Sequence, residues 1–177
     1  MRWKELLLDF FFPRRCPVCD QIVTPYGEKI CKKCRTQFKR IAEPKCKRCG
    51  KPLEKETAEY CYDCARKTFH YESGIAAFVY DAGMKNSIAR FKYAPFRREY
   101  ADYYAEEMCK ASRIQMRRWK PDALIPVPIH KARLAFRGFN QAELLARGLS
   151  SAVRSLILSI AVPIWYIVLR KQPPRKN

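Results

Sequence analysis

The chain has 177 residues, and its 36 Lys and Arg against 17 Asp and Glu give a formal charge of +19. Its hydrophobic fraction of 48% excludes a wholly disordered or collagen-like chain, and the length fits one ordinary domain or two small ones. No apolar run reaches the roughly 20 residues of a membrane-spanning helix, so none is expected. The charge favours polyanionic partners such as nucleic acid, anionic lipid or a phosphorylated substrate.

The N-terminal segment contains an apolar run from Leu6 to Phe12 that Asp9 interrupts. No small-residue cleavage site follows it, so the run predicts a short amphipathic helix and not a secretory signal. A cytoplasmic protein is therefore expected. In that compartment thiols stay reduced, and paired cysteines favour metal over disulfides.

Four CxxC pairs, which account for eight of the nine cysteines, dominate the first third of the chain at a fixed step of 15 residues. Two residues between thiolates suit one tight turn, and two such turns make the four-sulfur site typical of structural zinc. Chance, a disulfide framework and redox motifs are weaker alternatives, because a redox CxxC normally occurs singly. The expected ligands of two structural Zn²⁺ ions are Cys16, Cys19, Cys31, Cys34, Cys46, Cys49, Cys61 and Cys64.

The pairing of these motifs is open on spacing alone. Sequential pairing joins the first motif with the second and the third with the fourth, whereas interleaved pairing joins the first with the third. Sequential pairing is favoured because it closes shorter loops at a lower cost in entropy. About 55 residues with few large aliphatic side chains bury little core, so bound metal is expected to supply much of the folding energy.

The middle of the chain predicts one strand and two helices. Residues Tyr71 to Asp81 alternate as a strand does, and Lys85 to Tyr93 has the pattern of a short helix. Glu99 to Trp119 is the clearest helix, with an apolar stripe that we assign to the core. Basic residues are concentrated in its last turns, where they interact favourably with the helix dipole. A nucleic-acid-binding patch is the less favoured interpretation of these residues. Cys109 fits a small buried hydrophobic residue.

A strand, a basic loop and a helix follow. Ala123 to Pro128 predicts a buried parallel strand, and Ile129 to Phe139 a basic loop. Asn140 has the features of a helix N-cap, with Glu143 placed as in a capping box. A helix N-terminus offers free amides to an anion, and open α/β sheets bind ligands where strands end. The loop is thus a candidate phosphate or pyrophosphate site, and a solvated basic loop is the alternative.

Several strings resemble one family. IPVPIHK at 125–131 and RGFNQA at 137–142 resemble the signature of the ComF family, competence-associated proteins with a type I phosphoribosyltransferase-like domain. FPRRCPVC at 12–19, together with the cysteine ladder, resembles the double zinc ribbon that precedes this domain, and FKY at 91–93 also resembles the family. The resemblance covers roughly residues 1 to 150.

The resemblance implies a mixed α+β or α/β chain, in which an N-terminal four-cysteine double zinc ribbon precedes an incomplete phosphoribosyltransferase-like α/β domain. The ribbon is expected over 1–70, the partial domain over 71–150 and an aberrant basic and apolar tail over 151–177. By resemblance, the Pro128 to Asn140 loop lies on the pyrophosphate side of the site. Its expected contacts to a phosphoribosyl pyrophosphate-like ligand are Lys131, Arg137, Gly138 and Asn140.

The chain also departs from the family pattern. Such transferases carry two acidic residues and a Thr/Gly-rich loop after an apolar strand, and here no acidic residue follows Glu143. Mg²⁺ binding is expected only where that site is complete. Because the acidic residues and the loop are missing, we expect a truncated, inactive transferase. Residues 155–169 are largely apolar, and we expect a buried strand near Ile164 to Leu169 in preference to membrane contact.

The resemblance further implies a role in natural transformation, in the uptake of single-stranded DNA by the DNA-uptake machinery. The alternative is a non-enzymatic zinc-ribbon adaptor that binds single-stranded DNA or a DNA-translocation partner. It rests on the ribbon, the positive charge and the aromatic residues Phe38, Tyr60, Tyr62 and Phe69, for most of which a place in a small core is the favoured interpretation.

Overall fold

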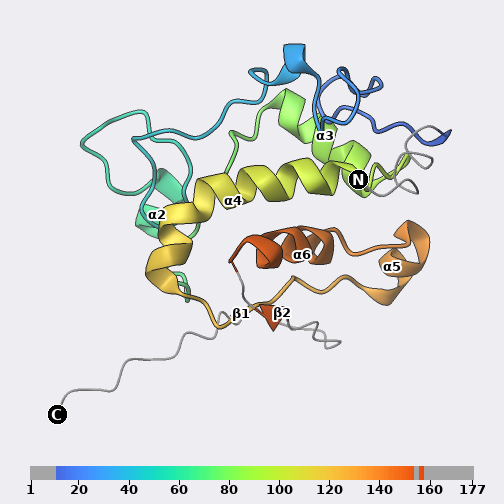
Figure 1. Ribbon diagram of the computed structural model, residues 1–177. Coiled ribbons are helices and arrows are strands. Elements are labelled where there is room, and N and C mark those ends of the chain that lie inside the picture. The colour runs from blue at the N-terminus through green and yellow to red at the C-terminus, as the bar shows by residue number, and fades with distance from the viewer. Residues whose placement is uncertain (1–10, 154–155, 158–177) are drawn as a thin grey trace. The chain divides into compact units, whose positions relative to one another are not determined.

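The structure, a computed structural model, describes residues 11–153 and 156–157. It divides into two compact units, Met1–Tyr104 and Ala105–Asn177. The division falls inside α4 (Tyr100–Trp119), the long yellow-green helix of Figure 1. The first unit extends beyond the cysteine-rich region because α3 (Ala82–Lys92) and the start of α4 make side-chain bonds to it. The domain boundaries expected after residues 70 and 150 remain predictions.

Within the described residues of the cysteine-rich region, helical structure is limited to the 3₁₀ turn η1 (Lys32–Cys34) and the short helix α2 (Tyr62–Arg66). The rest is turns and isolated antiparallel bridges. So little regular structure leaves the cysteines themselves as the main buried groups, and Cys16, Cys31, Cys34 and Cys46 are at most 1% exposed.

An aromatic cluster forms the core of the first unit. The ring of Phe38 lies 5.5 Å from that of Phe78 and 6.3 Å from that of Tyr103 between centroids. Phe91 of α3 packs edge-on against Tyr104 of α4 at 5.6 Å. Edge-to-face pairs of this kind add to the free energy gained from burying apolar area. Phe38 is therefore a core residue, 4% exposed, and not a free stacking surface.

Helix α3 begins three residues earlier than the predicted Lys85, at Ala82. The cause is Asp81, whose carboxylate accepts a hydrogen bond from the Met84 N–H at 2.9 Å. A side-chain acceptor at this position satisfies one of the free amides of the first turn. Helix α4 matches the prediction within one residue, and its buried face includes Ala101, Tyr104 and Ala105.

The prediction of a strand over Tyr71 to Asp81 was wrong. The segment has no regular secondary structure apart from the isolated bridge between Phe78 and Arg40. Its backbone makes hydrogen bonds to two different parts of the chain: Gly74 N donates to Arg48 O, and Val79 N donates to Lys39 O at 2.9 Å. Neither part continues as a strand, so the alternating pattern lacks a ladder in which to pair.

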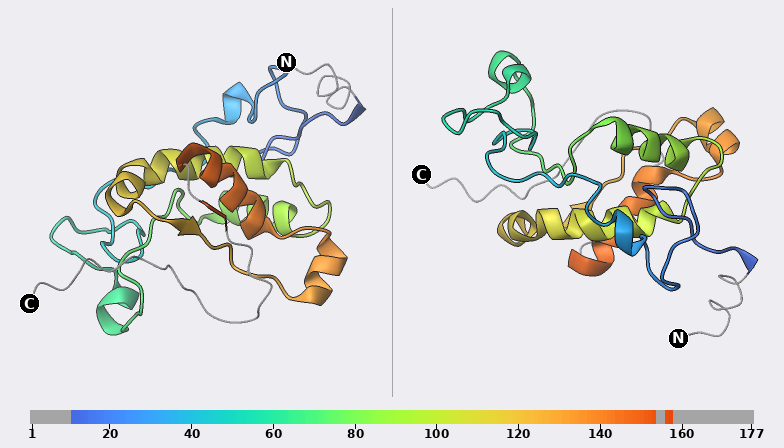
Figure 2. Two further views of the ribbon diagram at one scale, coloured as in Figure 1. Left: turned by 60° about the horizontal axis from the view of Figure 1, so that its bottom comes forward. Right: turned by 90° about the horizontal axis from the view of Figure 1, so that it is seen from above.

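In the second unit, β1 (Ala123–Leu124) pairs in parallel with β2 (Leu156–Ile157), as Figure 2 shows beside α6 (Gln141–Val153). The predicted parallel pairing is confirmed, but the strand is half-buried where a buried one was predicted, and it is shorter than Ala123 to Pro128. Pro126 and Pro128 lack the N–H that a ladder requires, which accounts for the early end. Helix α6 approaches α4 closely, because a Cβ at Gly148 would lie 2.4 Å from the Cβ of Ala105.

The predicted basic loop from Ile129 to Phe139 is mostly a helix, α5 (Lys131–Arg137). His130 caps it, since its Nδ1 accepts a hydrogen bond from Ala132 N at 3.3 Å. Gly138 ends it with a left-handed backbone, φ 77°. The charge of the segment suggested a loop, but Lys, Ala, Arg and Leu are strong helix formers.

Two predictions fall mainly or wholly outside the described residues. These are the amphipathic helix at the N-terminus and the strand near Ile164 to Leu169. In the part of the chain that the structure describes, we find no helix both long enough and apolar enough to span a bilayer.

Candidate metal centres and anion-binding turn

The eight motif cysteines gather into two groups. Within each group the four Sγ atoms lie within 4.8 Å of one another. The first group unites Cys16 and Cys19 with Cys31 and Cys34, and the second holds Cys46, Cys49, Cys61 and Cys64. Sequential pairing is therefore confirmed.

The geometry of both groups fits zinc. A tetrahedral Zn²⁺ with bonds of about 2.3 Å to sulfur sets its sulfurs about 3.8 Å apart. The Cys49 and Cys61 sulfurs already lie 3.6 Å apart, and every motif cysteine is a free thiol. Backbone amides support the thiolates, as where Thr24 N donates to Cys31 Sγ at 3.4 Å. The two groups are thus the two structural zinc sites of a double zinc ribbon.

The thiols within a group do not ionise alike. Burial, reinforced by neighbouring thiols, raises the pKa of Cys34 and of Cys64 to about 12. Burial also opposes ionisation of Cys46, but backbone N–H groups, including that of Cys49, outweigh it and lower the pKa of Cys46 to about 6. Zinc binds the thiolate, so loading these sites releases protons from the thiols with raised pKa values.

Each group opens with one CxxC turn. We call the turn of the first group knuckle 1 (Cys16–Asp20) and that of the second group knuckle 2 (Cys46–Gly50). The two turns lie 30 residues apart in the sequence and have the same backbone hydrogen bond. In knuckle 1, Asp20 N donates to Cys16 O at 2.8 Å; in knuckle 2, Gly50 N donates to Cys46 O at 2.9 Å. Both turns end with a positive φ, 56° at Asp20 and 74° at Gly50. The region is therefore a tandem repeat of one metal-binding unit.

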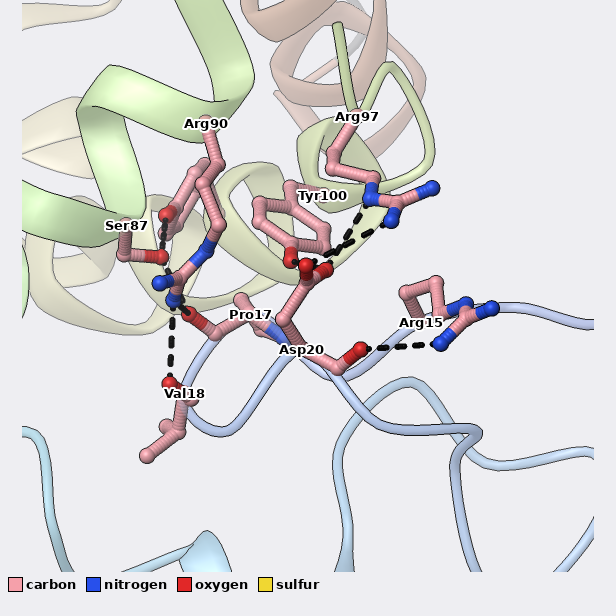
Figure 3. A network of polar contacts seen from close by, with 9 residues as sticks. Arg15, Pro17, Val18, Asp20, Ser87, Arg90, Arg97 and Tyr100 are labelled. Carbon is pink, nitrogen blue, oxygen red and sulfur yellow. Dashed lines mark hydrogen bonds and ion pairs between the residues drawn. The ribbon is translucent and has the colours of Figure 1, made fainter. Parts of the chain in front are cut away.

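Knuckle 1 is bonded to α3 and to the residues that open α4, as Figure 3 shows. Ser87 Oγ donates to Pro17 O, and Arg90 Nη2 donates to Pro17 O and Val18 O, both at 3.0 Å. We call these contacts, together with those of Asp20 to Arg97 and Tyr100, the docking network.

The carboxylate of Asp20 anchors the second half of the docking network. It accepts hydrogen bonds from the Tyr100 hydroxyl at 2.6 Å and from Arg97 Nε at 2.9 Å. Burial alone would raise the pKa of Asp20, but these two donors hold it below its usual value. Sequence reasoning missed this network. The one signal for it was an aspartate at position 20, where the repeat 30 residues later has glycine.

The predicted phosphate contacts lie at the two ends of α5. Lys131 is exposed at its first turn, while Arg137, Gly138 and Asn140 lie at the turn into α6. Asn140 is the N-cap of α6, because its Oδ1 accepts from Ala142 N at 3.0 Å. Arg137 is 8% exposed, and its Nη1 donates to Gln141 Oε1 at 2.6 Å. The structure thus brings three of the four residues together and sets Lys131 apart from them.

The capping box expected at this turn is only half formed. The Asn140 cap is confirmed, but Glu143 bonds to Arg147 at 2.6 Å one turn further along α6. The side-chain amide of Asn140 also donates to Val127 O at 3.1 Å, which ties the turn to the extended segment after β1.

Exposed aromatic rings and cations lie together around the second zinc site. Arg48 lies over the ring of Tyr60 at 5.5 Å, and Arg66 over the ring of Tyr62 at 4.9 Å. Tyr62 is 72% exposed and Tyr60 42%. Each ring is thus exposed and lies beside a cation, and Arg66 also donates a hydrogen bond to the Tyr62 hydroxyl.

Comparisons with known proteins agree with this geometry. The double zinc ribbon domain family matches residues 7–65. Competence protein ComFC of Bacillus subtilis (strain 168) is 30% identical over 128 residues, 67% of this chain and 50% of the relative. Competence protein ComFC of Streptococcus pneumoniae is 30% identical over 119 residues, 64% and 49% respectively. Competence protein F of Haemophilus influenzae is 29% identical over 143 residues, 79% and 61%.

The zinc ribbon and these relatives together place the chain in the ComF family. The chain spans about half the length of the first two relatives. No solved structure matches it significantly.

Proposed function

We propose that this chain serves in competence, the process for which its relatives are named, and that its 71–150 region is a phosphoribosyltransferase-like domain. The observation that carries the second half is the parallel pairing of β1, inside that region, with β2, which lies just after residue 150; the connection between them contains α5 and α6. A connection of this kind places the segment after β1 at the carboxyl edge of the pair. Ligands of α/β sheets bind at that edge.

The groups offered to an anion at this edge are those of the α5–α6 turn. Helix α6 has 13 residues, so its N-terminal amides and dipole favour a phosphate or pyrophosphate group. Asn140 caps the Ala142 amide and so fixes the turn, and the exposed Lys131 adds a cation at the opposite end of α5. Because Arg137 is buried against Gln141, its role in this proposal is to position the turn.

A ligand melt tests the proposal. Millimolar phosphoribosyl pyrophosphate, with and without Mg²⁺, should raise the Tm of the full chain. Lys131→Ala should reduce that shift and leave the Tm of the free chain unchanged, since Lys131 is exposed. Lys85→Ala, an exposed lysine of α3, is the matched control and should keep the shift. Absence of any shift in the wild-type chain would refute ligand binding.

A second candidate function, binding of single-stranded DNA, is favoured by the exposed Tyr60 and Tyr62 with their arginines. Aromatic faces stack on bases of any sequence, and neighbouring cations track the phosphates. Phe38 does not contribute, because it is buried, and Phe69 is half-buried against Tyr71 at 5.3 Å.

The eight thiols must stay reduced to hold zinc, so we place this activity in the cytoplasm.

Fluorescence anisotropy with a labelled oligothymidine separates this function from the first. Binding should weaken steeply with salt, and Tyr62→Ala should weaken it roughly tenfold, the worth of one lost base stack. Tyr80→Ala, a tyrosine that is 68% exposed but outside the ribbon, should change little. Equal effects of the two variants would exclude the ribbon tyrosines as the binding surface.

A further inference from the structure

The two knuckles share one backbone design, but their last residues differ. Gly50 adopts its positive φ without steric cost, as glycine does. Asp20 adopts nearly the same conformation, φ 56°, in which a side chain is disfavoured. The feature that distinguishes knuckle 1 is therefore the Asp20 carboxylate, which accepts hydrogen bonds from Arg97 and Tyr100.

The carboxylate of Asp20 reaches the segment that joins α3 to α4. It binds Arg97 and Tyr100, and the ion pair with Arg97 is shielded, with side chains 24% and 27% exposed. The knuckle carbonyls add two acceptors for α3, where Ser87 is fully buried and donates to Pro17 O. Knuckle 1 thus presents one carboxylate and two carbonyls to the two helices.

Knuckle 2 is attached differently. Arg48 O accepts from Gly74 N, and a Cβ at Gly50 would lie 2.8 Å from Ala76 N, so backbone meets backbone there. Lys47 of this turn pairs with Glu59, and Lys51, the next residue after it, pairs with Asp63; both ion pairs are exposed and remain within the second ribbon. Within the described residues, these contacts of knuckle 2 reach Gly74 and Ala76, and none of them is a side-chain bond to α3 or α4.

We propose that the two zinc sites have unequal roles, and that the first one alone holds α3 and the opening of α4 in place. The positions of the Pro17 and Val18 carbonyls and of Asp20 depend on the turn between Cys16 and Cys19, which zinc closes. Loss of metal from the first group therefore lets the Pro17 and Val18 carbonyls and the Asp20 carboxylate move, which breaks the docking network. Loss of metal from the second group leaves these hydrogen bonds to α3 and α4 intact. This inference is independent of the ligand or DNA proposed above.

Equivalent cysteines offer a matched pair of variants for the test. Cys19→Ser and Cys49→Ser each remove one ligand at the same place of the repeat, and both cysteines are half-buried. Hydrogen exchange of the full chain, followed by mass spectrometry, should show faster exchange over residues 82–104 in Cys19→Ser. In Cys49→Ser the increase should be confined to the second ribbon and the segment up to Ala76. Equal exchange over 82–104 in the two variants would overturn the proposal.

A second variant covers the case in which Cys19→Ser fails to fold. Asp20→Gly relieves the backbone strain and keeps all eight cysteines, so a mere turn residue would gain stability from this change. The proposal predicts the opposite: exchange over 82–104 should rise roughly tenfold, as expected when charged hydrogen bonds are lost. Asp63→Asn, which removes an exposed carboxylate beside the second site, is the control and should leave 82–104 unchanged. Slower or unaltered exchange in Asp20→Gly would also overturn the proposal.

Discussion

At the scale of single residues, the hydrogen bonds of Ser87 are the most buried link between the first ribbon and the helices. Its hydroxyl is fully buried and bonds to Pro17 O and to the Tyr104 hydroxyl. The buried hydroxyl of Tyr104 has no bulk water to replace a lost partner. Removing one member of such a pair costs the desolvation of the group left behind.

Ser87→Ala should therefore lower the free energy of unfolding by about 1–3 kcal/mol in a urea titration. Ser150→Ala is the control, because the Ser150 hydroxyl bonds to Arg147 O at 3.1 Å in an exposed setting. A surface change of that kind should stay within about 0.5 kcal/mol. If both variants unfold at the same urea concentration, the bonds of Ser87 contribute nothing measurable.

At the scale of elements, two glycines in helices have opposite surroundings. A Cβ at Gly148 of α6 would collide with the Cβ of Ala105 at 2.4 Å. A Cβ at Gly83 of α3 would meet only Asp81 Oδ1 at 3.4 Å, an ordinary contact. Alanine favours helices by up to about 1 kcal/mol over glycine, so the two sites separate propensity from packing.

Gly83→Ala should stabilise the chain by about 0.4–1 kcal/mol, because the alanine fits without displacement. Gly148→Ala should destabilise it by about 1–3 kcal/mol, since α6 must move away from α4. Thermal melts followed by circular dichroism measure both. A stabilising effect at Gly148 would contradict the close approach of α4 and α6.

The long helix α4 was easier to predict from this sequence than the strands, whereas the short helix α5 was predicted as a loop. The periodic stripe of α4 located that helix within one residue, because burial of one face sets its period. The segment from Tyr71 to Asp81 had a strand pattern but no ladder, and pairing depends on distant residues that a local pattern does not contain. The start of α3 depended on one cap, Asp81, that the apolar pattern does not reveal.

At the scale of the whole molecule, the metal ligands were predictable from the sequence, but the contacts that join the first metal site to α3 and α4 were not. Regular CxxC spacing identified all eight ligands, since each motif is a local turn with its own chemistry. The docking network joins Asp20 to residues about 80 positions away, and no local pattern marks Arg97 or Tyr100 as its partners. Arg137 illustrates the reverse case, in which a residue predicted at a ligand site is buried against Gln141.

Metal removal should affect the first unit most. Its cysteine-rich region has little helix and few large buried side chains apart from the thiols, so zinc supplies a large part of its folding free energy. A strong chelator under reducing conditions should lower the Tm of the full chain, and readdition of zinc should restore it. An unchanged melting curve after complete zinc removal would contradict that dependence.

The most direct test of the central claim, two zinc ions held by consecutive CxxC pairs, is native mass spectrometry of chain purified without chelator. We predict two zinc ions in the wild-type chain and one in the double variant Cys19→Ser/Cys31→Ser, which damages a single site. Cys19→Ser/Cys49→Ser damages both sites and should retain none. A wild-type chain with free thiols and no metal would contradict the account, as would loss of both ions from Cys19→Ser/Cys31→Ser.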